Sequence, residues 1–329
     1  MPPHRTTPHR ADLASALQKQ LRILLKQLPL ARRGNPEDVH RARVATRRLR
    51  EMLPVAAEAA GSRGCSRIAR EVRRITRALG PVREIDVALR ECALDAAPPP
   101  PVAAGARMAR HLQTERARRI RSMRLRLDGV ASRSIEQQVR ALTAGCDARS
   151  SGAAGARAAV DWRTLLAARI RKRALRLGET LQRVGTLYAA DPIHAVRIAA
   201  KKLRYTMELA ETAGAPCGVD VARLRRLQDL LGRLRDLQVL QEHVRAVLSG
   251  AAGHRAAAGA LAELDASLET QCRALHATFL RGMAQWQAAA EHAARDLPAA
   301  LIVRRMAKAA PADRTAARGP IRAHSAGRR

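Results

Sequence analysis

The sequence predicts an all-α protein, and three observations support that prediction. Only 2% of its 329 residues are aromatic, whereas alanine, leucine and arginine dominate the composition, which favours helices over strands. Leucines recur three and four positions apart, as on one face of a helix. Three blocks of the first half also recur in the same order in the second half, which indicates a helical unit present twice.

The three repeated blocks lie 152 to 154 positions apart. They are HRARVATRRLR (40–50) with HAVRIAAKKLR (194–204), LGPVREIDVAL (79–89) with LGRLRDLQVLQ (231–241), and the leucine-rich stretches 13–28 and 166–181. We therefore expect repeat one over residues 11–146 and repeat two over 158–303, joined by the linker 147–157, which is rich in glycine and serine. Residues 1–10 and the basic tail 304–329 are expected to be disordered.

In repeat one, a first helix is expected over about 11–30. Asn35 as N-cap and Pro36 at the first helical position begin a second helix, which Pro54 should kink or end. The remaining predicted elements are helices over 65–79, 81–94, about 103–127 and about 132–144, with Gly80 and Pro81 dividing the first two and a loop over 96–105. Repeat two follows the same plan, and its second helix begins at DPIH (191–194).

The chain carries 61 basic and 29 acidic residues, a formal net charge of +32. Such an excess repels itself and lowers stability, so we expect a polyanion to neutralise it: nucleic acid, an anionic membrane or inorganic polyphosphate. No apolar run reaches the ~20 residues of a membrane-spanning helix, and the N-terminus lacks the pattern of a secretory signal. The five cysteines form no CxxC pair, which indicates reduced thiols in the cytosol.

The first repeated block predicts an amphipathic helix with one basic side. At about 100° per residue, Arg43, Arg47 and Arg50 fall within about 80° of His40, and Arg48 lies about as far away on the other flank. The opposite side carries Ala42, Ala45, Leu49, Met52 and Leu53. The matching helix places His194, Arg197, Lys201, Lys202 and Arg204 in the same way. Like charges at this spacing destabilise a helix by roughly 0.2–0.5 kcal/mol per pair.

A solvated basic face is the simplest interpretation of one such helix. Because the same pattern occurs twice, we favour an anion-binding surface, in which guanidinium groups hold phosphate through paired hydrogen bonds and lysines act as point charges. More basic positions recur downstream. Arg73 and Arg74 of the third predicted helix match Arg225 and Arg226, and Arg83 of the next one matches Arg235. Glu84 follows Arg83 and Asp236 follows Arg235, and each acid either orients its arginine or forms an ordinary ion pair.

His40 and His194 each stand alone near the start of a basic helix. An arginine occupies the position three residues later in both cases, where a metal site would need a second ligand. We therefore expect no metal and no cofactor. The two histidines either hydrogen-bond to phosphate or hold the helices in place.

These blocks resemble the CHAD family, the conserved histidine α-helical domain. The family motif His-x-x-Arg-Val-x-x-Arg-Arg-Leu-Arg corresponds to 40–50, and its second-half form ending in Lys-Lys-Leu-Arg-Tyr corresponds to 194–205. The block Leu-Gly-x-x-Arg-Asp-x-Asp-Val corresponds to 79–87 and 231–239, with Glu84 and Gln238 each replacing an aspartate. The resemblance covers about residues 10–295.

The resemblance implies two helical bundles related by pseudo-twofold symmetry, with the basic helices lining a central channel or groove. It also implies binding of inorganic polyphosphate, at polyphosphate granules in the cytoplasm. Many relatives carry an N-terminal triphosphate-hydrolase domain with a Glu-x-Glu-x-Lys signature, which this sequence lacks, so we expect a stand-alone CHAD protein. The expected binding residues are His40, Arg43, Arg47, Arg48, Arg50, Arg73, Arg74, Arg83, His194, Arg197, Lys201, Lys202, Arg204, Arg225, Arg226 and Arg235.

Two other functions stay open at this point. Nucleic-acid binding fits the charge, and weak non-specific binding is expected, but single-strand binders stack bases on aromatic side chains and this chain has only five. A phosphotransfer enzyme acting through His40 or His194 would need a donor site, and the sequence contains no P-loop. We therefore expect a binding protein rather than an enzyme.

Overall fold

The computed structural model describes residues 13–62, 65–94, 102–150, 162–212, 217–250 and 255–309. Ten helices and no strand occur in those ranges, as the composition predicts. The first half contains α1 (Leu13–Arg33), α2 (Pro36–Ala59), α3 (Cys65–Leu94), α4 (Val102–Asp128) and α5 (Ser132–Ser150). The second half contains α6 (Trp162–Gln182), α7 (Ala190–Thr212), α8 (Gly218–Ser249), α9 (Arg255–Arg281) and α10 (Met283–Ala309).

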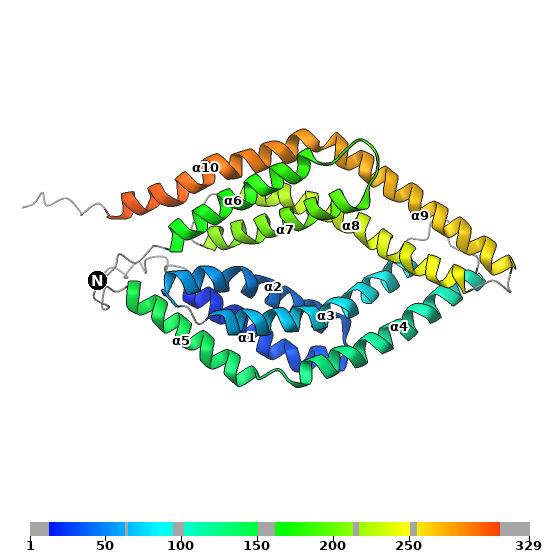
Figure 1. Ribbon diagram of the computed structural model, residues 1–329, viewed down its shortest axis with the longest axis horizontal. Helices are drawn as coiled ribbons and strands as arrows, with labels where there is room; N and C mark the ends of the chain where they lie inside the picture. Colours follow the sequence, from blue (N-terminus) through cyan, green and yellow to red (C-terminus); the bar gives the residue numbers. More distant parts are fainter. Residues whose placement is uncertain are drawn as a thin grey trace, which may run out of the picture.

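The helices have the same neighbours in both halves. In the first half α1 packs on α2, α2 on α3 and α3 on α4, while α5 returns to α1. In the second half α6 to α9 repeat this order, and α10 returns to α6. Figure 1 shows the two halves side by side, with α2 and α3 facing α7 and α8. Contacts of α2 with α7 and of α3 with α8 join them along this boundary.

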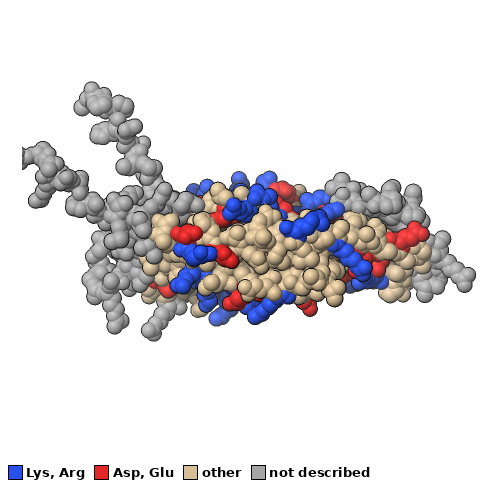
Figure 2. Space-filling view, turned by 90° about the horizontal axis from the view of Figure 1, so that it is seen from above, with Lys and Arg blue, Asp and Glu red and all other residues tan. Residues whose placement is uncertain are grey.

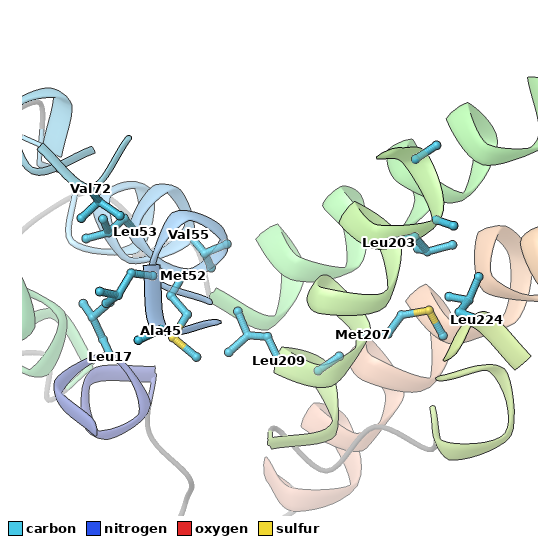
Figure 3. Packing of buried hydrophobic residues seen from close by; sticks show 14 of the residues in the cluster. Leu17, Ala45, Met52, Leu53, Val55, Val72, Leu203, Met207, Leu209 and Leu224 are labelled. Atoms are coloured by element: carbon cyan, nitrogen blue, oxygen red, sulfur yellow. The ribbon is translucent and has the colours of Figure 1, made fainter. Parts of the chain in front are cut away.

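One large apolar core runs through both halves. It includes Leu17, Leu53 and Val72 from the first half and Leu203 and Leu224 from the second, as Figure 3 shows. A smaller cluster joins α3 and α4 to α8 and α9. Each fully buried leucine contributes roughly 1.5–3 kcal/mol to folding, so the boundary between the halves is a packed interface that holds α2 and α7 in fixed positions.

The start of α2 follows the sequence prediction. The Asn35 side chain accepts hydrogen bonds from the backbone N–H groups of Glu37 (2.9 Å) and Asp38 (3.3 Å), and Pro36 occupies the first helical position. Gly34, just before the cap, has a positive φ of 88°, which a residue with a side chain adopts only with strain. This link of two residues fixes where α2 begins and hence the direction of its basic side.

One predicted helix end is wrong, and one of the two alternatives for Pro54 is excluded. Helix α2 continues to Ala59, so Pro54 does not end it, and α3 continues through Gly80 and Pro81 as a single helix. The residues on either side of Pro81 form one continuous buried face: Val72, Ile75, Leu79, Val82 and Ile85. Packing of that face outweighs the hydrogen bond that proline removes, and Gly80 has no Cβ to clash with the proline ring.

Three other boundaries also differ from the prediction. Helix α4 begins at Val102, inside the predicted loop, and α5 continues to Ser150, across the first residues of the predicted linker. Helix α10 continues to Ala309, into the predicted tail. The rest of the linker, the rest of the tail and residues 1–10 lie outside the described residues.

Candidate anion-binding site

Helices α2 and α7 bury the apolar faces that the sequence predicts. The buried residues are Ala42, Ala45, Leu49, Met52 and Leu53 on α2, and Val196, Ala199, Ala200 and Leu203 on α7. The repeated cations Arg43, Arg47, Arg197 and Lys201 lie away from these faces, yet each is half-buried rather than fully solvated. Protein therefore replaces part of the water around them, and residues of the opposite half are among their neighbours.

The two basic sides face each other across the boundary between the halves. Arg47 Nη1 on α2 donates a hydrogen bond to the Tyr205 hydroxyl on α7, at 3.5 Å. Arg43 lies close enough to Arg197 for each charge to act on the other, and Lys201 has both Arg43 and Arg47 among its nearest charges. We call Arg43, Arg47, Arg197 and Lys201 the central basic cluster.

Electrostatic repulsion in the central basic cluster is strong. Burial lowers the pKa of Lys201 to about 7, assisted by the charges of Arg47, Arg197, Arg43 and Arg50. Burial together with the charge of Arg47 lowers the pKa of Arg43 to about 10. Burial is the larger cause and the neighbouring cations the smaller one, and both make the charged form less stable, so the cluster is unfavourable to the free protein.

Two carboxylates partly offset this repulsion. Glu84 on α3 lies near both Arg43 and Arg197, and its charge favours the protonated form of each. Asp236 on α8 is the largest favourable influence on Arg197 after burial has lowered that pKa. Its own pKa is raised by burial, although Arg197 and other arginines oppose that change. Each acid is thus shared among several arginines.

The two histidines lie at the edges of the central basic cluster. Burial lowers the pKa of His40, and so do the charges of Arg83, Arg47 and Arg90. Burial also lowers the pKa of His194, with Arg197 and Arg235 as the next causes. Both imidazoles are therefore neutral near pH 7, and each presents one donor and one acceptor nitrogen rather than a charge.

Gly80 makes room for Arg43 on the surface of α3. A Cβ atom at Gly80 would lie 2.8 Å from Arg43 Nη1, closer than carbon and nitrogen pack. The matching residue of the second half, Gly232, has open space around its Cα. The glycine of the repeated Leu-Gly block therefore has a steric role only in the first half, where it lets one arginine of the cluster cross to α3.

Several predicted residues are held by partners outside the cluster. Arg204 donates to Glu208 (2.7 Å) and Gln228 (2.9 Å), and Arg225 donates to the same glutamate (3.3 Å). Two further partners are the Gly129 carbonyl for Arg74 at 3.1 Å and Glu242 for Arg235 at 3.0 Å. Besides the residues just named, four more predicted cations have exposed side chains and lie outside the cluster: Arg48, Arg73, Lys202 and Arg226. We call these four the outer basic set; Arg50 is exposed too but lies near Lys201.

Basic residues elsewhere on the surface are dispersed or structural. Figure 2 views the outer face of the second half, where lysine and arginine side chains are scattered and interspersed with acids. Other arginines bond to carbonyl groups at helix ends: Arg32 to Leu127, Arg124 to Arg32 at 2.9 Å, and Arg116 to Gly34. Such bonds satisfy terminal carbonyls that have no partner within the helix. Part of the large positive charge therefore serves the fold.

Comparison with protein families identifies the domain that carries this cluster. The model of the CHAD domain matches residues 15–245, which is more than half of the chain. The chain belongs to the CHAD domain family. The match ends within α8, short of residue 295, to which the sequence motifs led us to extend it.

Two curated relatives match most of the chain. The chain is 28% identical over 278 residues to the Mycobacterium tuberculosis proteins "Uncharacterized protein MT2285" (strain CDC 1551 / Oshkosh) and "Uncharacterized protein Rv2226" (strain ATCC 25618 / H37Rv). The match covers 82% of this chain and 53% of each relative, so the chain spans about half the length of these curated relatives.

The fold is shared with two solved structures. The crystal structure of the CHAD domain from the plant Ricinus communis matches with a TM-score of 0.60 and 19% identity, over 87% of this chain and 97% of that one. PptA from Streptomyces chartreusis matches with a TM-score of 0.59 and 22% identity, over 84% and 99%.

The acids of the second CHAD motif also contact arginines of other helices. Asp86 binds Arg116 of α4 at 2.7 Å, and Asp236 lies near Arg83 of the opposite half. In the second half Gln238 replaces the aspartate and donates to the Tyr188 hydroxyl at 2.7 Å. That Glu84 and Asp236 either orient the preceding arginine or form an ordinary ion pair with it stays a prediction.

Sequence reasoning missed two residues beside the central basic cluster. Arg90 lies near His40, Arg83 and Asp236, and its spacing of seven from Arg83 on one helix face would have indicated it. Tyr205 follows the second basic motif directly, but its contact with Arg47 depends on how α2 and α7 face each other.

The described ranges of this CHAD domain contain neither a membrane-spanning helix nor a group of metal-binding side chains. No described helix has an apolar stretch long enough to cross a lipid bilayer. Within the same ranges, no three side chains of histidine, cysteine, aspartate or glutamate converge in a way that would hold a metal ion.

Proposed function

We propose that this CHAD domain binds inorganic polyphosphate at the central basic cluster. The observation that carries the proposal is that half-buried cations from the two halves of the chain lie together. Their lowered pKa values mean that their charged forms are destabilised in the free protein. A ligand with closely spaced negative charges would supply the missing counter-charge. Guanidinium groups bind phosphate oxygens through two parallel hydrogen bonds, which suits Arg43, Arg47 and Arg197.

A linear phosphate polymer fits the arrangement better than a single anion. Arg43, Arg47 and Arg50 lie on successive turns of α2, and with a rise of about 1.5 Å per residue they extend over roughly 10 Å. Arg197 and Lys201 lie one turn apart on α7 in the same way. Consecutive phosphates would contact successive cations and release bound counterions, so the affinity should fall steeply with salt.

Nucleic acid is the second candidate ligand, but the cluster has few aromatic side chains on which bases could stack. Binding of single strands relies on aromatic platforms for the bases. Among the described residues near the cluster, Tyr205 is the aromatic one, and its ring already lies beneath the Arg204 guanidinium, 4.7 Å from the centroid. Polyphosphate has no bases and requires no such platform.

The proposal extends to the arrangement and location of the domain. We infer that the two halves are related by a pseudo-twofold axis, and that α2, α3, α7 and α8 line a groove or channel around the central basic cluster. Such a site would attach the protein to polyphosphate granules in the cytoplasm. We propose binding without chemical turnover, and detection of an acid-labile phosphate on His40 or His194 would argue against that part.

Two charge-matched variants test the site. In the first, glutamine replaces all four residues of the central basic cluster; in the second, glutamine replaces all four residues of the outer basic set. At pH 6, below the pKa of about 7 of Lys201, both lose about four positive charges, so generic attraction falls equally. We expect the first to lose at least about a hundredfold in affinity for labelled long-chain polyphosphate, since two lost charged contacts correspond to about that factor.

The outer variant should stay within about threefold of the unaltered protein. Equal losses of affinity in the two variants would mean that polyphosphate binds by non-specific attraction and not at the central basic cluster. Competition decides between the ligands: if DNA displaces labelled polyphosphate at equal phosphate concentration, nucleic acid becomes the better candidate. Far-UV circular dichroism of each variant shows whether the helices remain intact.

A further inference from the structure

We propose that Tyr205 is a positioning residue that holds Arg47 of the opposite half in place for the ligand of the central basic cluster. This inference rests on the proposed function and adds to it a residue that the charge pattern alone does not indicate. Tyr205 carries no charge, and it would act through Arg47 rather than by neutralising phosphate.

The tyrosine hydroxyl crosses the boundary between the halves. Arg47 Nη1 on α2 donates to the Tyr205 hydroxyl on α7 at 3.5 Å, and Arg43 on the same helix also lies near this phenol. Tyr205 is half-buried. A neutral acceptor at this point restrains an arginine without cancelling its charge, which leaves the remaining N–H groups of the guanidinium for phosphate.

The tyrosine is itself held by a braced arginine. The Arg204 guanidinium lies over the Tyr205 ring, 4.7 Å from its centroid. Glu208 and Gln228 accept hydrogen bonds from Arg204 at 2.7 and 2.9 Å, and Arg225 also donates to Glu208. A chain of contacts therefore runs from α8 through α7 to Arg47 on α2.

Among the described residues of the first half, the matching positions make different contacts. Glu51 stands at the position that matches Tyr205, and it pairs with Arg173 of α6, which in turn donates to the Lys202 carbonyl of α7 at 2.8 Å. Pro54 stands where the second half has Glu208, so position 54 offers Arg50 no carboxylate like the one that braces Arg204. Glu51 therefore ties α2 to α6 and α7 as a whole, whereas the Tyr205 hydroxyl is the contact that acts on Arg47.

Restraint of Arg47 should raise affinity by lowering the entropy lost on binding. A free arginine side chain samples many rotamers, and a ligand must fix one of them. A side chain already held near its bound position loses less freedom. This effect differs from charge neutralisation in one measurable way: it changes the affinity but not the number of counterions released.

Tyr205→Phe removes only the hydroxyl and keeps the ring beneath Arg204. We expect its affinity for long-chain sodium polyphosphate to fall about three- to tenfold, in line with one modest hydrogen bond. The slope of log K against log salt should stay unchanged. Arg47→Gln should lower both the affinity and that slope, because it removes a phosphate contact.

Tyr188→Phe is the matched control, since it removes a tyrosine hydroxyl that accepts a bond from Gln238 away from the cluster. It should bind polyphosphate as the unaltered protein does. Equal binding by Tyr205→Phe would overturn the inference, and so would a changed salt slope in that variant. Failure of the unaltered protein to bind polyphosphate would instead overturn the proposed function, and the inference with it.

A spectroscopic measurement separates positioning from a general loss of structure. The chain contains two tyrosines, so Tyr188→Phe protein labelled with ¹³C at the tyrosine ring carbon that bears the hydroxyl gives one NMR signal, from Tyr205. Arg47→Gln introduced into that protein should shift the signal, and so should added polyphosphate. A signal insensitive to both would contradict the contact and its role.

Discussion

Replacing Lys201 with methionine should stabilise the free protein and weaken ligand binding. Lys201 sits among three arginines of α2 and Arg197 of α7, and burial with these charges lowers its pKa from 10.5 to about 7. At about 1.36 kcal/mol per pKa unit, this change corresponds to roughly 5 kcal/mol of unfavourable energy in the charged form. Side-chain relaxation and solvent screening reduce the effect, so we expect a measured gain of about 1–3 kcal/mol at and below pH 7.

The pH dependence of this gain has a definite sign. Because the folded pKa lies below the unfolded one, the unfolded state binds more protons between pH 7 and 10.5, and the unaltered protein gains stability as pH rises through that window. The penalty is complete below about pH 7. The stability difference between Lys201→Met and the unaltered protein should therefore be largest at low pH and vanish toward pH 10.5.

Urea unfolding followed by far-UV circular dichroism at several pH values measures this difference. Lys202→Met, the exposed neighbour on the same helix, is the control and should change stability by less than about 0.5 kcal/mol. The reasoning is refuted if Lys201→Met is no more stable than the Lys202→Met control below pH 7, since Lys201 would then be an ordinarily solvated lysine. If Lys201→Met gains stability and loses polyphosphate affinity, the central basic cluster is a functional site that lowers the stability of the fold.

Three further predictions concern the same elements. Gly80→Ala should push the Arg43 guanidinium away from α3 and lower polyphosphate affinity by roughly tenfold, whereas Gly232→Ala should leave affinity unchanged and stabilise α8 by about 0.5–1 kcal/mol; titration calorimetry and thermal unfolding of both variants measure this, and equal affinities would contradict the role of Gly80. Polyphosphate affinity should fall as pH rises above about 7, because the ligand favours protonated Lys201; calorimetry in buffers of different ionisation enthalpy should show proton uptake, and Lys201→Arg should abolish it. Asn35→Ala should lower the free energy of unfolding by about 1 kcal/mol through loss of the α2 cap, and no change in urea unfolding would argue against the bonds to Glu37 and Asp38.

The sequence was sufficient to predict the amphipathic design of α2 and α7. Periodicity alone assigns Ala45 and Leu49 to the core and Arg43 and Arg47 to the other side, and the structure confirms both assignments. The repeat also indicated that two such helices exist. It did not reveal that Arg47 reaches Tyr205 of the other half, since that contact depends on how α2 and α7 are packed.

One error has an identifiable physical cause. Pro81 was expected to begin a new helix, but a continuous buried face and the absence of a Cβ at Gly80 allow α3 to pass through it. The binding role of Arg204 stays a prediction, but the sequence analysis did not mention that Glu208, one turn later, accepts a hydrogen bond from it. That partner was visible in the sequence, as an acid four positions after an arginine on one helix.

A crystal structure of the protein with short-chain polyphosphate bound would test the central claim most directly. The account predicts phosphate density between α2 and α7, with oxygen atoms within hydrogen-bonding distance of Arg43, Arg47 and Arg197. Ordered phosphate found instead on the outer basic set, with the central basic cluster still empty, would contradict it.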